Sequence, residues 1–429
     1  MTGLERLSAA EMAHAIRAGE TTPSAVMKAH LDRIAAREAE VGAFIHLDAD
    51  RAMSRAREAD RQPPKGLLHG VPFGIKDIID TDDMPTGWGS DIFAGRQPDR
   101  NAACVRAFLD AGAIPVGKTV TTEFAYFRPG KTANPHNPAH TPGGSSSGSA
   151  AAVADYMVPL AFGSQTAASL IRPAAYCGVC AFKPTTGGFD LSGVMALSPS
   201  LDTLGLLART PQDLALARSI LTGKPQPVSP DFSDTKPRIA LMRGPHWRDG
   251  SMEMRDVCGR AMRALADQGA ETGEIGSPPL FAELTDAQKI VMGYEAANAR
   301  RDVYTSHRDA ISIQFAQLIH EGRATTEGRY RAALAIRDRA RAMVDLMFAD
   351  YDGVLVPSAP GEAPEGLGAT GDPLFSRMWN LLQLPCVALP FGVGPRDLPV
   401  GVQLLGRLHE DAGLLAVAEW VHAVFNSAR

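Results

Sequence analysis

Hydrophobic and polar positions along the chain follow two periods, and these periods predict alternating helices and strands. Apolar residues three or four positions apart are typical of amphipathic helices, whereas short continuous apolar runs are typical of buried strands. Ser8 and Glu11 form a capping box for the first helix. Pro23, directly after Thr22, opens a second helix that runs to about residue 40. Further helices are predicted at 49–62, 103–112, 149–155, from 211 onward, and at 251–269, 285–349 and 410–425; strands are predicted at 43–48, 71–79, 114–120, 157–164, 236–244, 352–357, 386–391 and 400–406.

This alternation predicts an α/β protein whose sheet is covered on both faces. Neither an internal repeat nor a change in composition marks a domain boundary, so we predict one domain over residues 1–429. The longest Gly/Pro-rich loop after residue 150 lies at 357–373. It is either a lid over a substrate site or a solvated connection, and the sequence leaves both open.

The composition and net charge of the chain favour some classes of ligand over others. With 429 residues, 45% hydrophobic, and a net charge of only −5, the chain can bury a large core and carries no block of like charges. We therefore expect a small-molecule ligand, with no nucleic acid and no membrane as partner. The N-terminal pattern is amphipathic rather than signal-like, and no window reaches the roughly 18 apolar residues of a spanning helix, which predicts a cytoplasmic protein.

The cysteines do not predict a metal or redox site. The close pair, Cys177 and Cys180, lacks the second pair or the histidines that a zinc site needs. We expect all five cysteines to be small packing residues, and we expect no metal and no cofactor.

One motif matches a nucleotide-binding loop, but the elements predicted on either side of it do not match those of such a loop. Residues 112–119, GAIPVGKT, match GxxxxGK[ST]. A phosphate loop follows a strand and opens a helix, whereas here a helical pattern precedes the motif and β-branched residues follow it. Pro115 also removes one backbone amide from the supposed cradle. We therefore interpret the motif as helix, turn and strand without nucleotide binding.

Hydroxyl groups are concentrated in two turns. The stretch TPGGSSSGSAAA, 141–152, has the composition of a linker, yet it lies directly before a buried segment. After that segment the chain enters a second polar turn, GSQTAAS, which ends at Ser169. Because one helix and one strand separate the two turns, we expect the turns to face each other.

A serine nucleophile needs a base, and the sequence offers two kinds. His136 and His140 lie in a Pro-rich loop without an orienting carboxylate, and no GxSxG elbow supports a histidine triad. Lys76 lies in the apolar run VPFGIKDII, where burial would lower its pKa and make a neutral amine available. Alternatively, Lys76 pairs with Asp77 or Asp80 at a strand end, and the residues alone leave the two roles open.

These residues resemble the amidase signature family, which are serine hydrolases with a Ser-cisSer-Lys triad. The likeness rests on GVPFGIKD, on TPGGSSSGSAAAVA and on GSQTAASLIRPAAYCGVCAFKPT; it extends to LDTLGLLARTPQDLAL and to VGVQLLGRLHEDAGLLAVAEW near the C-terminus. It covers about 65–222 and 352–425, and the helical stretch between them is not diagnostic. The resemblance implies a mixed, twisted β-sheet core sandwiched between α-helices.

The resemblance also implies roles for individual residues. Lys76 would be the base, Ser169 the nucleophile and Ser145 the proton relay, held by a cis peptide bond at either 144–145 or 145–146. The glycines would shape the turn. The remaining hydroxyls of the block, Ser146, Ser147 and Ser149, would hold that turn by local hydrogen bonds. The oxyanion hole would be formed by the backbone amides of Thr166, Ala167, Ala168 and Ser169.

The chain departs from the family pattern around the nucleophile. QTAAS stands where DTGGS is commoner, so Gln165 replaces an acid, and Ala167 and Ala168 replace glycines. Alanine resists positive φ, so this loop must accommodate a Cβ or differ in geometry. Arg172 also lies three rather than two positions after the serine.

The implied activity is hydrolysis of the C(=O)–N bond of a small-molecule amide through an acyl-enzyme, with carbamates and esters left open. Aromatic residues after the GKT turn are candidates for the substrate pocket: Phe124, Tyr126 and Phe127. One alternative is an amidotransferase component that releases ammonia within a tRNA-dependent complex. Another is a binding protein without catalysis. The sequence does not decide the oligomeric state, and a homodimer is one arrangement that it allows.

Overall fold

The structure is a computed structural model that describes residues 3–225, 232 and 235–428. In these residues eleven strands form one mixed sheet in the order β1-β3-β2-β4-β6-β5-β10-β11-β9-β7-β8. The strands are β1 Phe44–Leu47, β2 Pro72–Lys76, β3 Ile114–Thr119, β4 Leu160–Gln165, β5 Cys180–Lys183, β6 Thr203–Ala208, β7 Arg238–Met242, β8 Glu271–Ile275, β9 Gly353–Pro357, β10 Cys386–Val393 and β11 Pro399–Leu405. The predicted α/β class, with a mixed sheet between helices, is confirmed.

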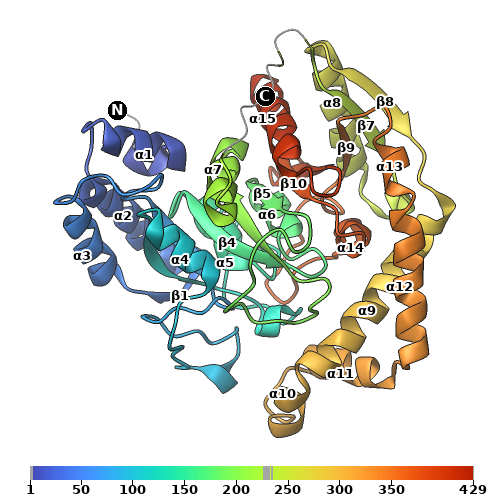
Figure 1. The fold of residues 1–429 in the computed structure, drawn as a ribbon, viewed down its shortest axis with the longest axis horizontal. Coiled ribbons are helices and arrows are strands. Elements are labelled where there is room, and N and C mark those ends of the chain that lie inside the picture. Colours follow the sequence, from blue (N-terminus) through green and yellow to red (C-terminus); the bar gives the residue numbers. More distant parts are fainter. Residues whose placement is uncertain (1–2, 226–231, 233–234, 429) are drawn as a thin grey trace.

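Helices cover the sheet and extend beyond it. They are α1 Ala9–Arg17, α2 Pro23–Val41, α3 Ala49–Ala59, α4 Ala103–Asp110, α5 Ser147–Ala154, α6 Ile171–Cys177, α7 Pro211–Thr222, α8 Met252–Asp267, α9 Leu284–Ala299, α10 Arg301–Ser306, α11 Ile313–Ala324, α12 Glu327–Arg341, α13 Val344–Met347, α14 Leu374–Leu381 and α15 Asp411–Ser427. Figure 1 shows α1–α3 at one side of the molecule, and α9, α11 and α12 together at the opposite side.

Local sequence signals explain where several helices begin. The Ser8 hydroxyl accepts from the Glu11 amide while the Glu11 carboxylate accepts from the Ser8 amide, so the predicted capping box is present. Thr22 caps α2 and Thr210 caps α7, in each case with proline as the first helical residue. The elements missed by the sequence analysis are short and buried or lie in mixed patterns: β5, β6, β8, α6 and α14.

The residues around the GKT motif fold as helix, turn and strand, as their sequence context predicts. Helix α4 ends before Gly112, which has φ 86°, and the remaining residues form β3. Lys118 of this motif is fully buried inside the sheet. The local structure is therefore helix, turn and strand, the reverse of a phosphate loop.

The sheet brings the ends of two strands to one edge. β2 runs parallel to β3 and to β4, so the carboxyl end of β2 at Lys76 and that of β4 at Gln165 lie on the same side. Helix α5, which begins inside the Gly/Ser block, packs against β2 and β4. This arrangement brings the two polar turns together beside Lys76.

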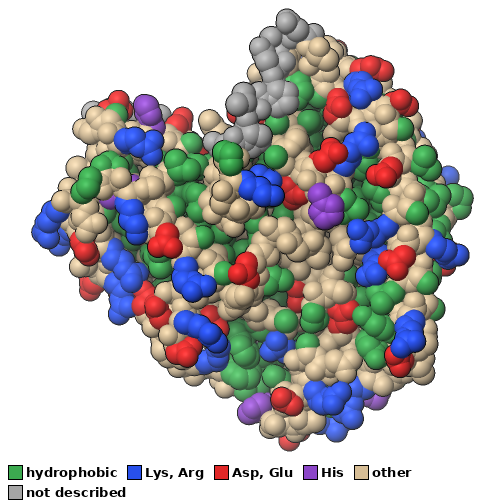
Figure 2. Space-filling model, in the orientation of Figure 1, with side chains coloured by type: hydrophobic (Ala, Val, Ile, Leu, Met, Phe, Trp, Pro, Cys, Tyr) green, Lys and Arg blue, Asp and Glu red, His purple; other side chains and the backbone are tan. Residues whose placement is uncertain are grey.

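The surface carries charges of both signs, interspersed with apolar side chains over the face in Figure 2. All five cysteines are buried. Among the described residues no helix combines the length and the hydropathy required to cross a membrane.

Candidate active site

Lys76 is the last residue of β2, and its side chain is 0% exposed. Its Nζ donates to three hydroxyl oxygens, those of Ser145 at 2.7 Å, Ser164 at 2.8 Å and Ser146 at 3.1 Å. Burial lowers the pKa of Lys76 well below its usual value, and the charge of Asp202 opposes this only in part. A neutral amine is therefore accessible at this position.

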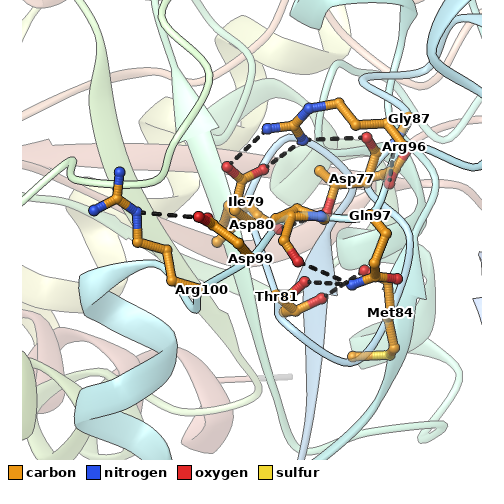
Figure 3. Close-up of polar contacts among 12 residues, drawn as sticks. Asp77, Ile79, Asp80, Thr81, Met84, Gly87, Arg96, Gln97, Asp99 and Arg100 are labelled. Atoms are coloured by element: carbon orange, nitrogen blue, oxygen red, sulfur yellow. Dashed lines mark hydrogen bonds and ion pairs between the residues drawn. The ribbon is translucent and has the colours of Figure 1, made fainter.

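The two aspartates near Lys76 have other partners. Asp80 forms a double contact with Arg96, at 2.8 and 3.0 Å, as Figure 3 shows. Asp77 accepts from the backbone amides of Gly87 at 3.0 Å and Gly89 at 3.3 Å. Of the two roles that the sequence left open, the geometry therefore favours a lysine among hydroxyls over a lysine paired with a carboxylate.

The Gly/Ser block is an ordered and buried turn. Its Gly144–Ser145 peptide bond is cis, which decides between the two bonds left open by the sequence. Gly143 has φ 82°, and a Cβ on Gly148 would lie 2.1 Å from the carbonyl oxygen of Ala43. These glycines are required by backbone conformation and close approach, so the block does not act as a linker.

Hydrogen bonds of the neighbouring serines hold this turn, but they go to distant backbone carbonyls and not to local groups as predicted. Ser147 Oγ donates to the Val120 carbonyl at 3.2 Å, and Ser149 Oγ donates to the Phe162 carbonyl at 2.8 Å. The backbone amide of Ser146 donates to the carbonyl of Ser169 at 3.0 Å. This last bond joins the two hydroxyl-rich turns directly.

Ser169 lies two residues before the buried helix α6. The side-chain oxygen of Gln165 accepts from the backbone amides of Leu170 and Ile171, both at 3.1 Å. An amide oxygen thus binds the first amides at the start of α6. Neither Ala167 nor Ala168 has a positive φ, so a Cβ causes no backbone strain at either position.

The Thr166 carbonyl is held by two side chains from distant helices. Asn380 Nδ2 donates to it at 2.8 Å and Gln288 Nε2 at 3.0 Å. In a trans peptide the carbonyl and the next N–H point in opposite directions, so these two bonds fix the direction of the Ala167 N–H. The Thr166 hydroxyl donates to Asp202 at 2.6 Å, and burial raises the pKa of that carboxyl to about 6.

A small pocket adjoins both turns. Its lining contains Thr122, Ala125, Tyr126, Phe127, Ser145, Thr166, Ala167, Ala168, Ser169, Arg172, Leu197, Met292, Thr370 and Pro373. The predicted relay and nucleophile therefore open onto one space with the predicted oxyanion residues. Two residues of the 357–373 loop also face it, while closure of this loop as a lid stays a prediction.

The aromatic residues predicted for the pocket divide into two groups. Tyr126 and Phe127 line the pocket. Phe124 does not belong to its lining; its side chain is 0% exposed and packs against the rings of Phe93 and Phe315. Its assignment to the pocket was therefore wrong, because an aromatic side chain near a site fills the core as readily as a pocket.

The two histidines considered as bases do not contact a serine of the site. His136 Nε2 lies 2.9 Å from the carbonyl oxygen of Cys177, and His140 Nδ1 lies 2.9 Å from that of Ala363. Within the described ranges no three His, Cys, Asp or Glu side chains gather as a metal ion would require.

Arg172 supports the turn that carries the cis bond. Its guanidinium is buried and donates to the carbonyl oxygens of Gly144 at 2.6 Å and Gly371 at 2.7 Å, and to the Thr370 hydroxyl at 3.0 Å. The sequence identified Arg172 only by its shifted spacing. It gave no signal for Asn380 or Gln288, which reach the site from 214 and 122 residues away from Thr166.

The family model for Amidase matches residues 25–415. The chain belongs to the amidase family, as its signature motifs predicted. It is 32% identical to the A subunit of a glutamyl-tRNA(Gln) amidotransferase from Acidothermus cellulolyticus, over 99% of this chain and 95% of that protein. The A subunit of the amidotransferase from Chloroflexus aggregans is also 32% identical, over 98% of this chain and 96% of that protein.

Solved structures with this fold include hydrolases. A crystal structure of an amidase aligns with a TM-score of 0.89 at 29% identity, covering 97% of this chain and 99% of that one. The peptide amidase of Stenotrophomonas maltophilia aligns with a TM-score of 0.83 at 27% identity, covering 97% of this chain and 96% of that one.

Proposed function

We propose that this protein hydrolyses the C(=O)–N bond of a small-molecule amide through an acyl-enzyme on Ser169. The observation that carries the proposal is the 2.7 Å contact between the buried Lys76 Nζ and Ser145 Oγ, where Ser145 shares a pocket with Ser169. A lysine held among hydroxyls can be neutral, and a neutral amine can accept a proton.

In the proposed first step, Ser169 Oγ attacks the carbonyl carbon while its proton passes to Ser145, whose own proton passes to Lys76. The backbone amides of residues 166–169 donate to the developing oxyanion. The bonds from Asn380 and Gln288 to the Thr166 carbonyl support this role, because they set the direction of the next N–H before substrate binds.

In the proposed second step, the tetrahedral intermediate collapses and the C–N bond breaks. The leaving amine takes a proton from Ser145, which recovers one from the Lys76 ammonium. Water then attacks the acyl-enzyme by the same relay and releases the acid and Ser169. Carbamates and esters present the same kind of acyl carbon, so the proposal includes them as further substrates.

Labelling with a fluorophosphonate probe tests the nucleophile. We expect the wild type to be labelled, Ser169→Ala to be unlabelled, and Lys76→Ala to be labelled much more slowly, because the serine then lacks its base. An unlabelled wild type contradicts the mechanism and favours a binding protein without catalysis. Turnover of a panel of aliphatic amides, anilides, carbamates and esters then defines the acyl and leaving groups; turnover of esters alone contradicts the amidase assignment.

A second candidate function is supported by the relatives that belong to glutamyl-tRNA(Gln) amidotransferases. In this role the same site would release ammonia from an amide inside a tRNA-dependent complex. The purified chain separates the two. Rapid turnover of simple amides by the chain alone supports the hydrolase, whereas release of ammonia only from glutamine, and only with partner proteins, supports the amidotransferase.

A further inference from the structure

Arg377 on α14 is a buried cation without a carboxylate in contact. Its side chain is 6% exposed, and Nη1 donates to Gln288 Oε1 at 2.5 Å. Within the part of the chain that the structure describes, no Asp or Glu forms an ion pair with it. Burying a guanidinium is costly unless an anion or several acceptors compensate the charge.

The space beside Arg377 adjoins the pocket of Ser169. Arg377 lines a cavity that is open to solvent, and Tyr126 and Met292 line both this cavity and the pocket that contains Ser169. The two spaces are therefore neighbours across Tyr126 and Met292.

Acidic groups near this cavity have other partners. Asp286 pairs with Lys289 at 3.0 Å, and Glu321 accepts from Gln317 at 2.8 Å. Asp372 accepts from the backbone amide of Leu374 at 2.9 Å. Their charges act on Arg377 or Tyr126 from a distance, and none of them forms an ion pair with the guanidinium.

A second guanidinium adds to the positive potential. Arg172 lines the Ser169 pocket, and the acceptors that it contacts are neutral carbonyl and hydroxyl oxygens. Burial lowers the pKa of Arg172 to about 10, and the charge of Arg377 contributes in the same direction. Negative charge near these two arginines would offset their mutual repulsion.

We propose that the substrate carries a carboxylate, which Arg377 binds while the amide lies at Ser169. The substrate class is then a monoamide of a short dicarboxylic acid. A planar guanidinium with free N–H groups suits bidentate recognition of a carboxylate. This inference rests on the proposed function for the position of the amide, whereas the anion site itself rests on Arg377 and its cavity.

The same arginine is linked to the oxyanion turn. Gln288 accepts from Arg377 through Oε1 and donates through Nε2 to the Thr166 carbonyl. A substrate carboxylate on Arg377 would therefore contact the side chain that orients Gln288, so loss of Arg377 affects both substrate selection and the turn. The experiment must separate these two effects.

The test compares each acid with a neutral amide of matched length: succinamate with butanamide, glutaramate with pentanamide, and adipamate with hexanamide. In the wild type we expect kcat/KM for the best acid to exceed that of its neutral partner by about 100-fold. In Arg377→Met we expect this ratio to fall about 100-fold, and in Arg377→Lys to fall less, because the charge remains without the fork. A disturbed oxyanion turn alone would lower both rates and leave the ratio unchanged, which would overturn the proposal.

Arg329→Met is the matched control, because Arg329 lines the same cavity from the exposed surface of α12. We expect the acid-to-neutral ratio in this variant to change less than about threefold. An equal fall in Arg329→Met and Arg377→Met would assign the selectivity to general surface charge and overturn the specific site.

Binding without turnover separates this inference from the proposed function. Calorimetry of glutarate with Ser169→Ala should show binding that Arg377→Met in the same background weakens about 100-fold. If fluorophosphonate labelling fails but this binding is present, the hydrolytic mechanism is wrong and the anion site stands. If labelling succeeds and glutarate binding does not depend on Arg377, the anion site is wrong and the hydrolase stands.

Discussion

Two buried lysines lie on adjacent strands and have different surroundings. In the register of β2 with β3, Lys118 pairs with Ile75, so Lys118 and Lys76 project to opposite faces of the sheet. Lys76 contacts only hydroxyl groups. Lys118 Nζ donates to the carbonyl oxygen of Ile79, and at 2.7 Å to the hydroxyl of Thr86.

Nearby charges increase this difference. Burial lowers the pKa of both amines, but three aspartates, Asp77, Asp80 and Asp83, attract Lys118 and hold its pKa at about 8. For Lys76, whose pKa burial lowers well below its usual value, only Asp202 acts in that direction. A hydroxyl can donate or accept, so the serines can solvate a neutral Lys76, whereas the carbonyl beside Lys118 requires an N–H donor. Under the proposed function, this comparison predicts that Lys118 contributes to stability and that Lys76 acts as the base.

Replacing each lysine by methionine gives the largest expected contrast. We expect Lys76→Met to lower kcat/KM about 10³-fold, because the proposed base is lost. We expect Lys118→Met to change kcat/KM less than about tenfold but to lower the free energy of unfolding by about 1–3 kcal/mol, since the buried Ile79 carbonyl keeps only the longer contact with the Thr86 hydroxyl. Steady-state kinetics and urea denaturation measure the two effects.

Folding must be checked before the kinetic comparison is made. Circular dichroism of Lys76→Met should resemble the wild type, because methionine keeps most of the apolar stem of the side chain; the urea midpoint measures what the loss of the three hydroxyl contacts costs. If Lys118→Met is as inactive as Lys76→Met while still folded, the division between the two lysines is wrong.

Removal of one hydroxyl partner from each lysine gives a smaller contrast. Ser164→Ala removes an acceptor of Lys76, and Thr86→Val removes an acceptor of Lys118. We expect Ser164→Ala to lower kcat about tenfold through a misplaced amine, an effect of about 1.4 kcal/mol on the barrier. We expect Thr86→Val to leave kcat within about twofold and to lower the free energy of unfolding by about 1 kcal/mol. Equal kinetic losses in both variants would remove the distinction.

Short-range signals explain what the sequence predicted well. The capping box at Ser8, the proline starts of α2 and α7, and the reversed context of the GKT motif all depend on residues close in the chain. The motifs also predicted that Lys76, Ser145 and Ser169 belong to one site, and the fold brings them beside one pocket. Their catalytic roles stay predictions until the variants are measured.

Long-range contacts explain what the sequence did not give. Gln288 and Asn380 reach Thr166 from helices of the C-terminal half, and Arg377 reaches the site 89 residues away from Gln288. Nothing in the local pattern around these residues distinguishes a site from a buried helix face. Phe124 was misassigned for a related reason: Tyr126 and Phe127 line the pocket, but the ring of Phe124 packs against Phe93 and Phe315, which are distant in the sequence.

The smallest expected effect is a shift in pH dependence. The proposed base is neutral Lys76, so kcat/KM should rise as pH rises through the lowered pKa of this amine and should be lost as pH falls below it. The negative charge of Asp202 raises that pKa by stabilising the ammonium form. Asp202→Asn keeps an oxygen acceptor for the Thr166 hydroxyl but removes the charge, so the acid limb should move to lower pH by about 0.5 unit.

Asp80→Asn is the matched control for this shift, because Asp80 acts on Lys118 at the other face of the sheet. It should lower the pKa of Lys118 and leave the acid limb of kcat/KM within about 0.2 pH unit of the wild type. The quantity to measure is the pH midpoint of the acid limb. The absolute rate of Asp202→Asn also reflects the loss of a charged partner for Thr166. A midpoint that moves to higher pH in Asp202→Asn, or by the same amount in both variants, would show that the limb does not report the ionisation of Lys76.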